Sequence, residues 1–228
     1  MRRSLLSTAA WIGFATIGFA GPFTNGSFES PGLNPATNRF FTTPGNDTFV
    51  TGWTHVASAV NSNGNLDFYS SNGAWGINAD NGSNYIGFGG SGTTGGILFQ
   101  TFDTVIGTSY TVNYRLTTQQ LPGNVIPLES VLVEGLNGAT VLNSVSTSFN
   151  PLAGVWIDGN TLTFIATSTS STLRFTDTSN GATAFSVNWG LDTVTVNSSV
   201  GSGVPEPATW SMIGLGVVAL AAFRRRAK

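Results

Sequence analysis

Large aromatic side chains are the residues of this sequence best suited to binding chemistry. A flat ring stacks on the apolar face of a pyranose, and polar neighbours bind the sugar hydroxyls. Trp75 lies in SSNGAWGINADNGSN, a Gly- and Asn-rich stretch typical of a loop, where a large ring has few core neighbours. We expect Trp53 and Trp189, which lie in strand-like runs, to be core residues. Trp75 and Tyr85 are the leading carbohydrate-binding candidates, among a wider set of Trp53, Trp75, Trp156, Trp189, Tyr69 and Tyr85.

Catalytic and metal-binding groups are scarce. His55 is the only histidine and cysteine is absent, which excludes thiol nucleophiles and the usual zinc ligand sets. No Gly-x-Ser-x-Gly turn accompanies the histidine. Acidic residues are spread through the interior, and no two of them stand out as the carboxyl pair that a glycosidase needs. We therefore expect no enzymatic activity, with a cryptic glycoside hydrolase as the remaining catalytic alternative.

The first twenty residues have the layout of a secretory signal peptide. Two arginines precede an apolar run from Leu5 to Phe19, and the small residue Ala20 stands at the expected cleavage position. The apolar run is shorter than the roughly 20 residues that span a bilayer. We expect residues 1–20 to be removed on export, so that the mature chain begins at Gly21.

The interior is acidic once the two ends are set aside. Between Gly21 and Val204 the only cations are Arg39, Arg115 and Arg174, against ten acidic residues, which gives a net charge near −7. Such a domain has no electrostatic footprint for a phosphate backbone, and this excludes nucleic acid as a partner. Without cysteine, an exported domain has no disulfides and depends on its buried core.

Apolar and polar residues alternate in short runs, the period of a half-buried β-strand. Ser109–Thr118 is the clearest run, and Asn-Gly and Asp-Gly pairs between runs favour tight turns. About ten short strands at this spacing indicate an all-β fold, a jelly-roll β-sandwich. The predicted strands are Phe49–Val60, Leu66–Tyr69, Tyr85–Phe88, Ile97–Phe102, Ser109–Thr118, Leu128–Glu134, Val141–Val145, Thr161–Thr167, Leu173–Asp177, Phe185–Val187 and Leu191–Val196.

The C-terminal 25 residues contain three physical parts in order. Val204-Pro205-Glu206-Pro207 is a stiff extended element, because each proline fixes φ and biases its predecessor away from helix. Residues 208–223 form an apolar stretch without charge, and a cluster of cations follows: Arg224, Arg225, Arg226 and Lys228. Cations after an apolar span stay on the cytoplasmic side. The pattern predicts one transmembrane helix with the domain outside.

This tail resembles the PEP-CTERM sorting signal of Gram-negative bacteria, in which a Pro-Glu-Pro motif precedes a membrane helix and an arginine cluster. The resemblance implies transient contact with the inner membrane and processing by an exosortase. It also implies delivery to the cell envelope, the outer surface or the extracellular matrix. The recognition residues would be Pro205, Glu206 and Pro207, with the arginine cluster Arg224, Arg225 and Arg226. An ordinary single-pass anchor is the alternative.

The interior resembles galactose-binding-like jelly rolls, which include carbohydrate-binding modules and the choice-of-anchor proteins. Asn25-Gly26-Ser27-Phe28-Glu29 is similar to their opening strand, and Gly190 to Val196 is similar to their closing strand. Further landmarks occur in the same order between them: Gly52-Trp53, Gly95 to Phe102 and Ile106 to Tyr110. In such folds a structural calcium lies where the first and last strands meet. The resemblance implies Glu29 and Asp192 as its carboxylate ligands.

We therefore expect a non-enzymatic envelope protein that binds a carbohydrate or exopolysaccharide weakly, for example in a biofilm. The alternative from another class is a structural surface or adhesion protein without a sugar site. The expected divisions are a signal peptide at 1–20, a β-sandwich at 21–196, a linker at 197–203 and the sorting signal at 204–228.

Overall fold

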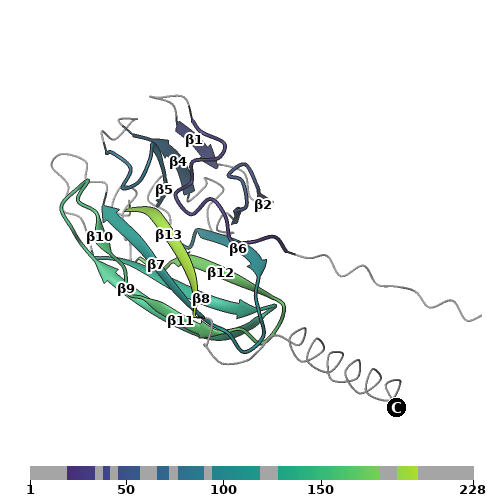
Figure 1. The fold of residues 1–228 in the computed structure, drawn as a ribbon. Coiled ribbons are helices and arrows are strands. Elements are labelled where there is room, and N and C mark those ends of the chain that lie inside the picture. The colour runs from purple at the N-terminus through teal and green to yellow at the C-terminus, as the bar shows by residue number, and fades with distance from the viewer. Residues whose placement is uncertain are drawn as a thin grey trace, which may run out of the picture.

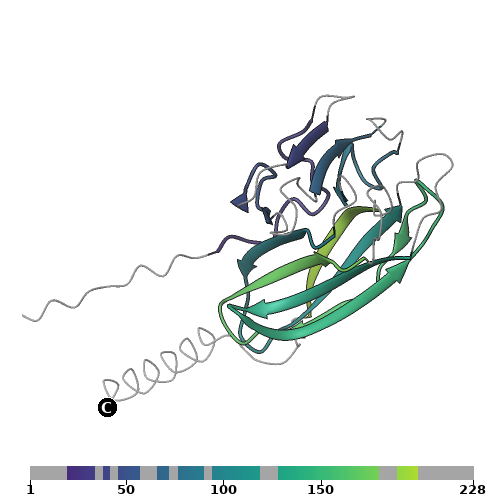
Figure 2. The same ribbon diagram turned by 180° about the vertical axis from the view of Figure 1, so that it is seen from behind.

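Two antiparallel β-sheets packed face to face make up the domain (Figure 1; the reverse side is in Figure 2). The computed structural model describes residues 20–33, 38–41, 46–56, 66–71, 77–89, 94–118, 128–179 and 189–199. This part of the chain contains no helix, which confirms the predicted all-β sandwich. The predicted signal peptide and sorting tail lie outside these ranges, apart from Ala20. Within these ranges no helix is long and apolar enough to cross a membrane.

Sheet A contains seven of the described strands, all paired antiparallel. Its hydrogen-bonding order is β1-β4-β5-β13-β7-β10, and β11 also pairs with β7. The bounds are β1 Asn38–Phe41, β4 Leu66–Ser70, β5 Asn84–Phe88, β7 Ser109–Thr118, β10 Ile157–Asp158, β11 Leu162–Ile165 and β13 Trp189–Ser199.

Sheet B contains six described strands in the order β2-β3-β6-β12-β8-β9, also antiparallel throughout. Its long members are well paired: β12 forms ladders with both β6 and β8. The bounds are β2 Asn46–Asp47, β3 Thr54–Val56, β6 Ile97–Asp103, β8 Glu129–Asn137, β9 Thr140–Phe149 and β12 Ser170–Asp177.

The core between the sheets is rich in large aromatic residues. Trp189 is fully buried and stacks on Phe88 of the neighbouring strand, with ring centroids 4.0 Å apart and planes 2° apart. Trp53 is 1% exposed, so both tryptophans predicted to be core residues are confirmed there. Alternation puts every second side chain of β7 into this core, since successive side chains of a strand point to opposite faces: Tyr110, Val112, Tyr114 and Leu116.

The opening segment joins the last strand, as the resemblance to galactose-binding-like folds implies. The Val194 backbone N–H donates to the Gly26 carbonyl at 2.8 Å. Asn25 adopts a left-handed conformation with φ 53°, which asparagine tolerates better than most residues. Its carbonyl accepts a 2.9 Å hydrogen bond from the Trp53 indole, and its side-chain amide donates to the Thr51 carbonyl. Asn25 of the opening segment therefore holds the core residue Trp53 in place through a hydrogen bond to its indole.

Several sequence-based strand boundaries differ from the structure, and two of the differences have a clear physical cause. The predicted strand Phe49–Val60 is interrupted by a turn in which the Trp53 N–H donates to the Val50 carbonyl and Gly52 has φ 83°. Only Thr54–Val56 of that run is a described strand. β13 continues to Ser199, three residues into the predicted linker, because β7 supplies ladder partners as far as Ser109. The predicted strand Phe185–Val187 lies outside the described residues.

Replacing Gly26 with alanine should destabilise the domain strongly. A Cβ atom at this position would collide with the Val194 carbonyl oxygen, and neither backbone segment moves away without breaking the contact between the opening segment and β13. Overpacking of this kind costs about 3 kcal/mol. Chemical denaturation would measure the loss. Gly21→Ala is the matched control, because nothing lies within 4 Å of a Cβ there. Equal stability of the two variants would contradict this packing.

Candidate functional site

Sheet A is covered on both of its faces at β4 and β5. β4 and β5 are buried at every position, unlike the half-buried strands of sheet B. Leu66, Phe68, Ile86 and Phe88 belong to the core between the sheets, so the alternate residues point to the outer face. A second apolar cluster lies on that outer face; we call it the outer cluster, and it consists of Tyr69, Ile77, Ala79, Tyr85 and Trp156.

The aromatic rings of the outer cluster contact one another in sequence. Tyr69 stacks on Tyr85, with centroids 5.3 Å apart and planes 30° apart, and Tyr85 meets Trp156 edge-on at 5.7 Å. Both tyrosines are buried, whereas Trp156 is half-buried. The Trp156 indole N–H donates to the Asn78 carbonyl at 2.9 Å. Trp156 is therefore the ring of this cluster that solvent, or a ligand, reaches.

A glycine lets the indole lie close to the sheet. A Cβ atom on Gly190 in β13 would come within 3.2 Å of both the Trp156 ring and the Tyr85 ring. In the strand register Gly190 is opposite Gly87 on β5 and Thr117 on β7. The two glycines leave the middle of the outer face without side chains. Trp156 fills part of this space and is held in one orientation.

A charged network borders Trp156. Arg115 of β7 binds Asp158 of β10 at 2.7 Å (Nη1 to Oδ1) and Asp80 at 3.3 Å (Nε to Oδ1). Its other terminal nitrogen donates to the Trp156 carbonyl at 2.9 Å. The hydrogen bond to Asp158 is the largest effect that raises the pKa of Arg115, which is charged in any case. The Asp158 carboxylate is 87% exposed and can accept further hydrogen bonds.

The two carboxylates predicted as calcium ligands, Glu29 and Asp192, both accept hydrogen bonds from the turn at residues 81–84. Glu29 Oε1 accepts hydrogen bonds from the backbone N–H groups of Ser83 and Asn84 at 2.8 and 2.7 Å. Asp192 Oδ2 accepts one from the Asn81 N–H at 3.0 Å. Burial raises the pKa of Asp192 to about 7. The described residues contain no group of three His, Cys, Asp or Glu side chains arranged around a common metal position. Calcium binding stays a prediction.

Asp67 lies under the same outer face, 4% exposed. The Tyr69 hydroxyl donates to its Oδ2 at 2.6 Å. Burial raises the pKa of this carboxyl to about 6, and the tyrosine hydrogen bond offsets part of that effect. The outer face thus combines rings, an arginine and buried carboxyl groups within one sheet.

The remaining sequence-based site residues are placed only in part. Tyr85 is buried within the outer cluster, so it supports Trp156 rather than offering an open ring face. Trp75 lies outside the described residues, between Ser71 and the cluster residue Ile77. The sorting residues also lie outside them: Pro205, Glu206, Pro207, Arg224, Arg225 and Arg226.

Sequence reasoning named Trp156 only among several candidates and did not single out Arg115, Asp80 or Asp158. The scarcity of cations was the one signal in the sequence. Because the interior has only three arginines and ten acids, each arginine is expected to pair with an acid. The contacts of Arg115 with Asp80 and Asp158 show this, as does the 2.7 Å ion pair between Arg174 and Glu134 on the outer face of sheet B. The partners themselves are distant in the chain, which no local pattern reveals.

Residues 203–226 match the family model of the PEP-CTERM protein-sorting motif, which confirms the motif recognised in the sequence. A search of curated proteins finds no significant match to the chain.

Several solved β-structures resemble the domain at low identity. TmCBM61 in complex with β-1,4-galactotriose is 14% identical with a TM-score of 0.44, covering 78% of this chain and 99% of that one. A family 35 carbohydrate-binding module from Clostridium thermocellum is 14% identical with a TM-score of 0.43, covering 72% and 100%. A cleaved adhesin domain of Lys-gingipain from Porphyromonas gingivalis is 14% identical with a TM-score of 0.45, covering 72% and 99%.

Asp67→Asn should change how stability depends on pH. The carboxyl pKa is raised from 3.8 to about 6 in the folded state, so its contribution to stability is fully present below pH 3.8 and is lost as pH rises through 6. At pH 7.5 the asparagine variant should be more stable by up to about 3 kcal/mol, since each pKa unit corresponds to about 1.4 kcal/mol. Urea unfolding across pH 4–8 would measure this.

Tyr69→Phe is the companion variant for this experiment. It removes the hydrogen bond that lowers the Asp67 pKa, so the loss of stability should move to higher pH. If wild type and Asp67→Asn gave parallel stability curves, the buried carboxyl would not be the titrating group.

Proposed function

We propose that this chain is an exported cell-envelope protein whose β-sandwich binds a carbohydrate, such as exopolysaccharide, without catalysing a reaction. The PEP-CTERM motif at residues 203–226 supports export from a Gram-negative bacterium and processing by an exosortase. The observation that carries the sugar-binding part is the half-buried Trp156 indole, fixed beside the Arg115–Asp158 ion pair.

The chemistry around Trp156 suits a sugar ring. A rigid indole offers an apolar face, and it loses little conformational entropy on binding because its N–H hydrogen bond and the neighbouring Tyr85 ring already fix it. The exposed Asp158 carboxylate accepts hydrogen bonds from hydroxyl groups, and its pairing with Arg115 keeps it oriented. Trp75, two residues before Ile77 in the sequence, is the second aromatic that we propose for sugar binding.

The same contacts support binding rather than hydrolysis. Asp80 and Asp158 both bind Arg115, so one oxygen of each carboxylate is already used as a hydrogen-bond acceptor. A glycosidase needs one carboxyl group that keeps its proton near neutral pH and faces the glycosidic oxygen. Asp67 and Asp192 have raised pKa values, but at 4% and 0% exposure other residues cover them and they do not reach solvent.

A structural calcium ion belongs to the same proposal, with Glu29 and Asp192 as carboxylate ligands. Calcium takes six to eight hard oxygens, and an ionised carboxylate has about four lone-pair sites, more than the turn occupies here. A bound cation would also supply the positive charge that the buried Asp192 lacks. We expect a chelator to lower the melting temperature by several degrees and added calcium to restore it. A melting curve that chelator leaves unchanged would contradict the proposed calcium site.

Glycan binding is tested with residues 21–203 and the exopolysaccharide of the host, in calcium and in chelator. Trp156→Ala and Trp75→Ala should each weaken retention at least about tenfold, the equivalent of 1.4 kcal/mol. Phe99→Ala is the matched control, because Phe99 is a half-buried ring on the outer face of sheet B. Equal losses for all three variants, or none for Trp156→Ala, would contradict the proposed surface. No retention of the wild-type domain would favour the structural or adhesion alternative.

Sorting is tested by replacing Pro205, Glu206 and Pro207 with alanine in the full-length chain. The variant should accumulate unprocessed in the inner membrane, because the rigid motif that the exosortase would recognise is gone. Membrane fractionation and the size of the product measure this. Ser202→Ala with Val204→Ala is the control that changes flanking residues only. Normal processing of the triple variant would show that the tail is an ordinary anchor.

A further inference from the structure

Three turns of the chain gather at one end of the sandwich. They connect β6 to β7, β8 to β9, and β11 to β12, and they bind one another through hydrogen bonds. The Gly107 N–H donates to the Ala166 carbonyl at 2.8 Å, and the Asn137 side-chain amide donates to the Thr167 hydroxyl at 2.9 Å. We call residues 104–108, 137–142 and 165–169 the apolar end. These hydrogen bonds hold its three parts together as one surface.

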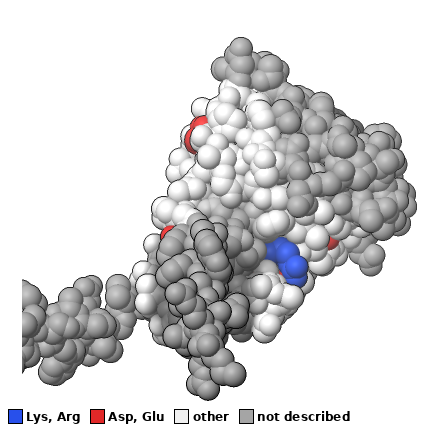
Figure 3. Space-filling model, turned by 90° about the vertical axis from the view of Figure 1, so that its right-hand side faces the viewer, with Lys and Arg blue, Asp and Glu red and all other residues white. Residues whose placement is uncertain are grey.

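The apolar end exposes large hydrophobic side chains without any charge. Val105 is 65% exposed, Ile106 62%, Ile165 59% and Val141 47%. The three segments contain no Asp, Glu, Lys or Arg. The view toward this side of the molecule is mostly uncharged where residues are described (Figure 3). Apolar side chains held in water at a turn are unfavourable unless something covers them.

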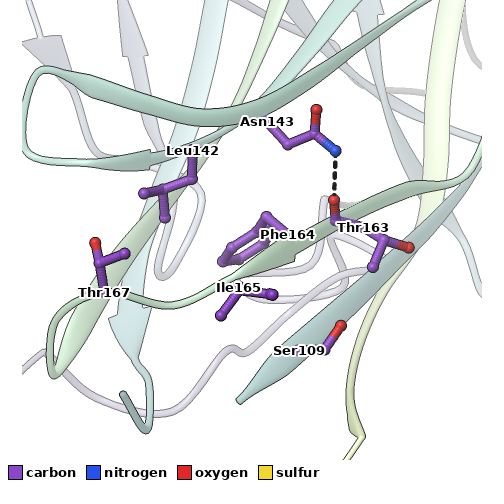
Figure 4. Close-up of a pocket in the computed structure, with 7 residues that line it drawn as sticks. All are labelled: Ser109, Leu142, Asn143, Thr163, Phe164, Ile165 and Thr167. Atoms are coloured by element: carbon purple, nitrogen blue, oxygen red, sulfur yellow. Dashed lines mark hydrogen bonds between the residues drawn. The ribbon is translucent and has the colours of Figure 1, made fainter. Parts of the chain in front are cut away.

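An open pocket enters the sandwich beside these side chains. It lies between β9 and β11, has a volume of about 490 Å³, and is lined on its apolar side by Leu142, Phe164 and Ile165 (Figure 4). The Asn143 side-chain amide donates to the Thr163 carbonyl at 2.6 Å across the pocket, which holds the two strands at this separation. The apolar surface therefore continues from the turns into the sandwich edge.

The last strand delivers the tail to this same end. β13 pairs with β7 up to Ser199 opposite Ser109, and the Ser199 hydroxyl donates to the Ser109 carbonyl at 3.2 Å. Ile165 is also opposite Ser109, on the other side of β7. Pro205 follows six residues later, a reach of at most about 20 Å. The apolar stretch 208–223 comes directly after the Pro-Glu-Pro motif.

We propose that the apolar end rests on the outer surface of the inner membrane while the tail spans it, so that Val105, Ile106 and Ile165 enter the lipid interface. This inference rests on the proposed sorting function and adds an orientation of the domain to it. The short connection keeps the end within reach of the bilayer. Charge also bears on the orientation, because an acidic domain is repelled by anionic lipid over a Debye length of about 10 Å. The three segments of the apolar end contain no acid, and the exposed Asp103 borders them directly before Thr104.

The opposite end of the sandwich supplies a matched control. Leu152 there is 77% exposed, and the connection that carries it is fixed by the Gly154 N–H donating to the Thr118 carbonyl at the far end of β7. β7 has ten residues, which separates the two ends by about 30 Å. If exposure of a hydrophobic residue were enough for membrane contact, Leu152 would behave like Ile106.

The chain has no cysteine, so single cysteines report one position each. We would place a fluorescent label at Ile106→Cys, Ile165→Cys, Leu152→Cys and, in the tail, Val217→Cys. The full-length chain would be reconstituted in phosphatidylethanolamine–phosphatidylglycerol vesicles that contain lipid with a nitroxide quencher. We expect the labels at 106, 165 and 217 to lose most of their fluorescence and the label at 152 to keep it. Val105→Ser with Ile165→Ser, added to Ile106→Cys, should restore most of the signal.

The label in the tail distinguishes the two possible failures. Quenching at position 217 with full fluorescence at 106 and 165 would overturn the docking of the apolar end and leave the membrane tail intact. Full fluorescence at 217 would contradict the membrane tail, and the docking inference falls with it. Quenching at 152 equal to that at 106 would show unspecific contact with lipid and would also overturn the inference.

Discussion

The insertion of β13 into the middle of sheet A is the constraint on which the rest of the structure depends. This last strand pairs with β5 on one side and β7 on the other, so sheet A is incomplete without it. It carries Trp189, whose ring stacks on Phe88 in the core. Its outward residues are Gly190, which admits the Trp156 ring, and Asp192, which binds the turn after Asp80. This one strand therefore contributes to the core and to the outer face of sheet A, and its end fixes where the tail begins.

Because β13 is the last of the described strands and lies between β5 and β7, sheet A closes only once β13 is in place. The pairing of β5 with β13 is a contact of high sequence separation, and such contacts slow folding. Closure also fixes where the tail leaves, beside the start of β7 at Ser109. The PEP-CTERM motif at residues 203–226 follows shortly after the end of β13 in the sequence.

The sequence predicts the parts of this protein that depend on local patterns. Alternation located β7 and β12, and the three-part tail identified the sorting motif without any structure. Burial on both faces was not predictable, because the pattern of β4 does not say that Ile77 and Trp156 cover its outer side. For the same reason Tyr85 was expected to be open and is buried.

The charged network was hidden by distance along the chain. Asp80 and Asp158 lie 35 and 43 residues from Arg115, and Asp192 lies 111 residues from Asn81. Only the strand register brings them to one face. The scarcity of cations indicated that Arg115 would be paired with an acid, but the interior between Gly21 and Val204 offers ten acids and only the fold selects among them.

The central claim is that the outer face of sheet A around Trp156 is the ligand-binding surface. Its most direct test is a two-dimensional NMR titration of the domain with oligosaccharides released from the host exopolysaccharide. The account predicts that the indole N–H of Trp156 and the side-chain N–H groups of Arg115 shift with one saturating curve, while the indole of the core residue Trp53 stays fixed. Shifts confined to the outer face of sheet B, around Phe99 and Arg174, would contradict it.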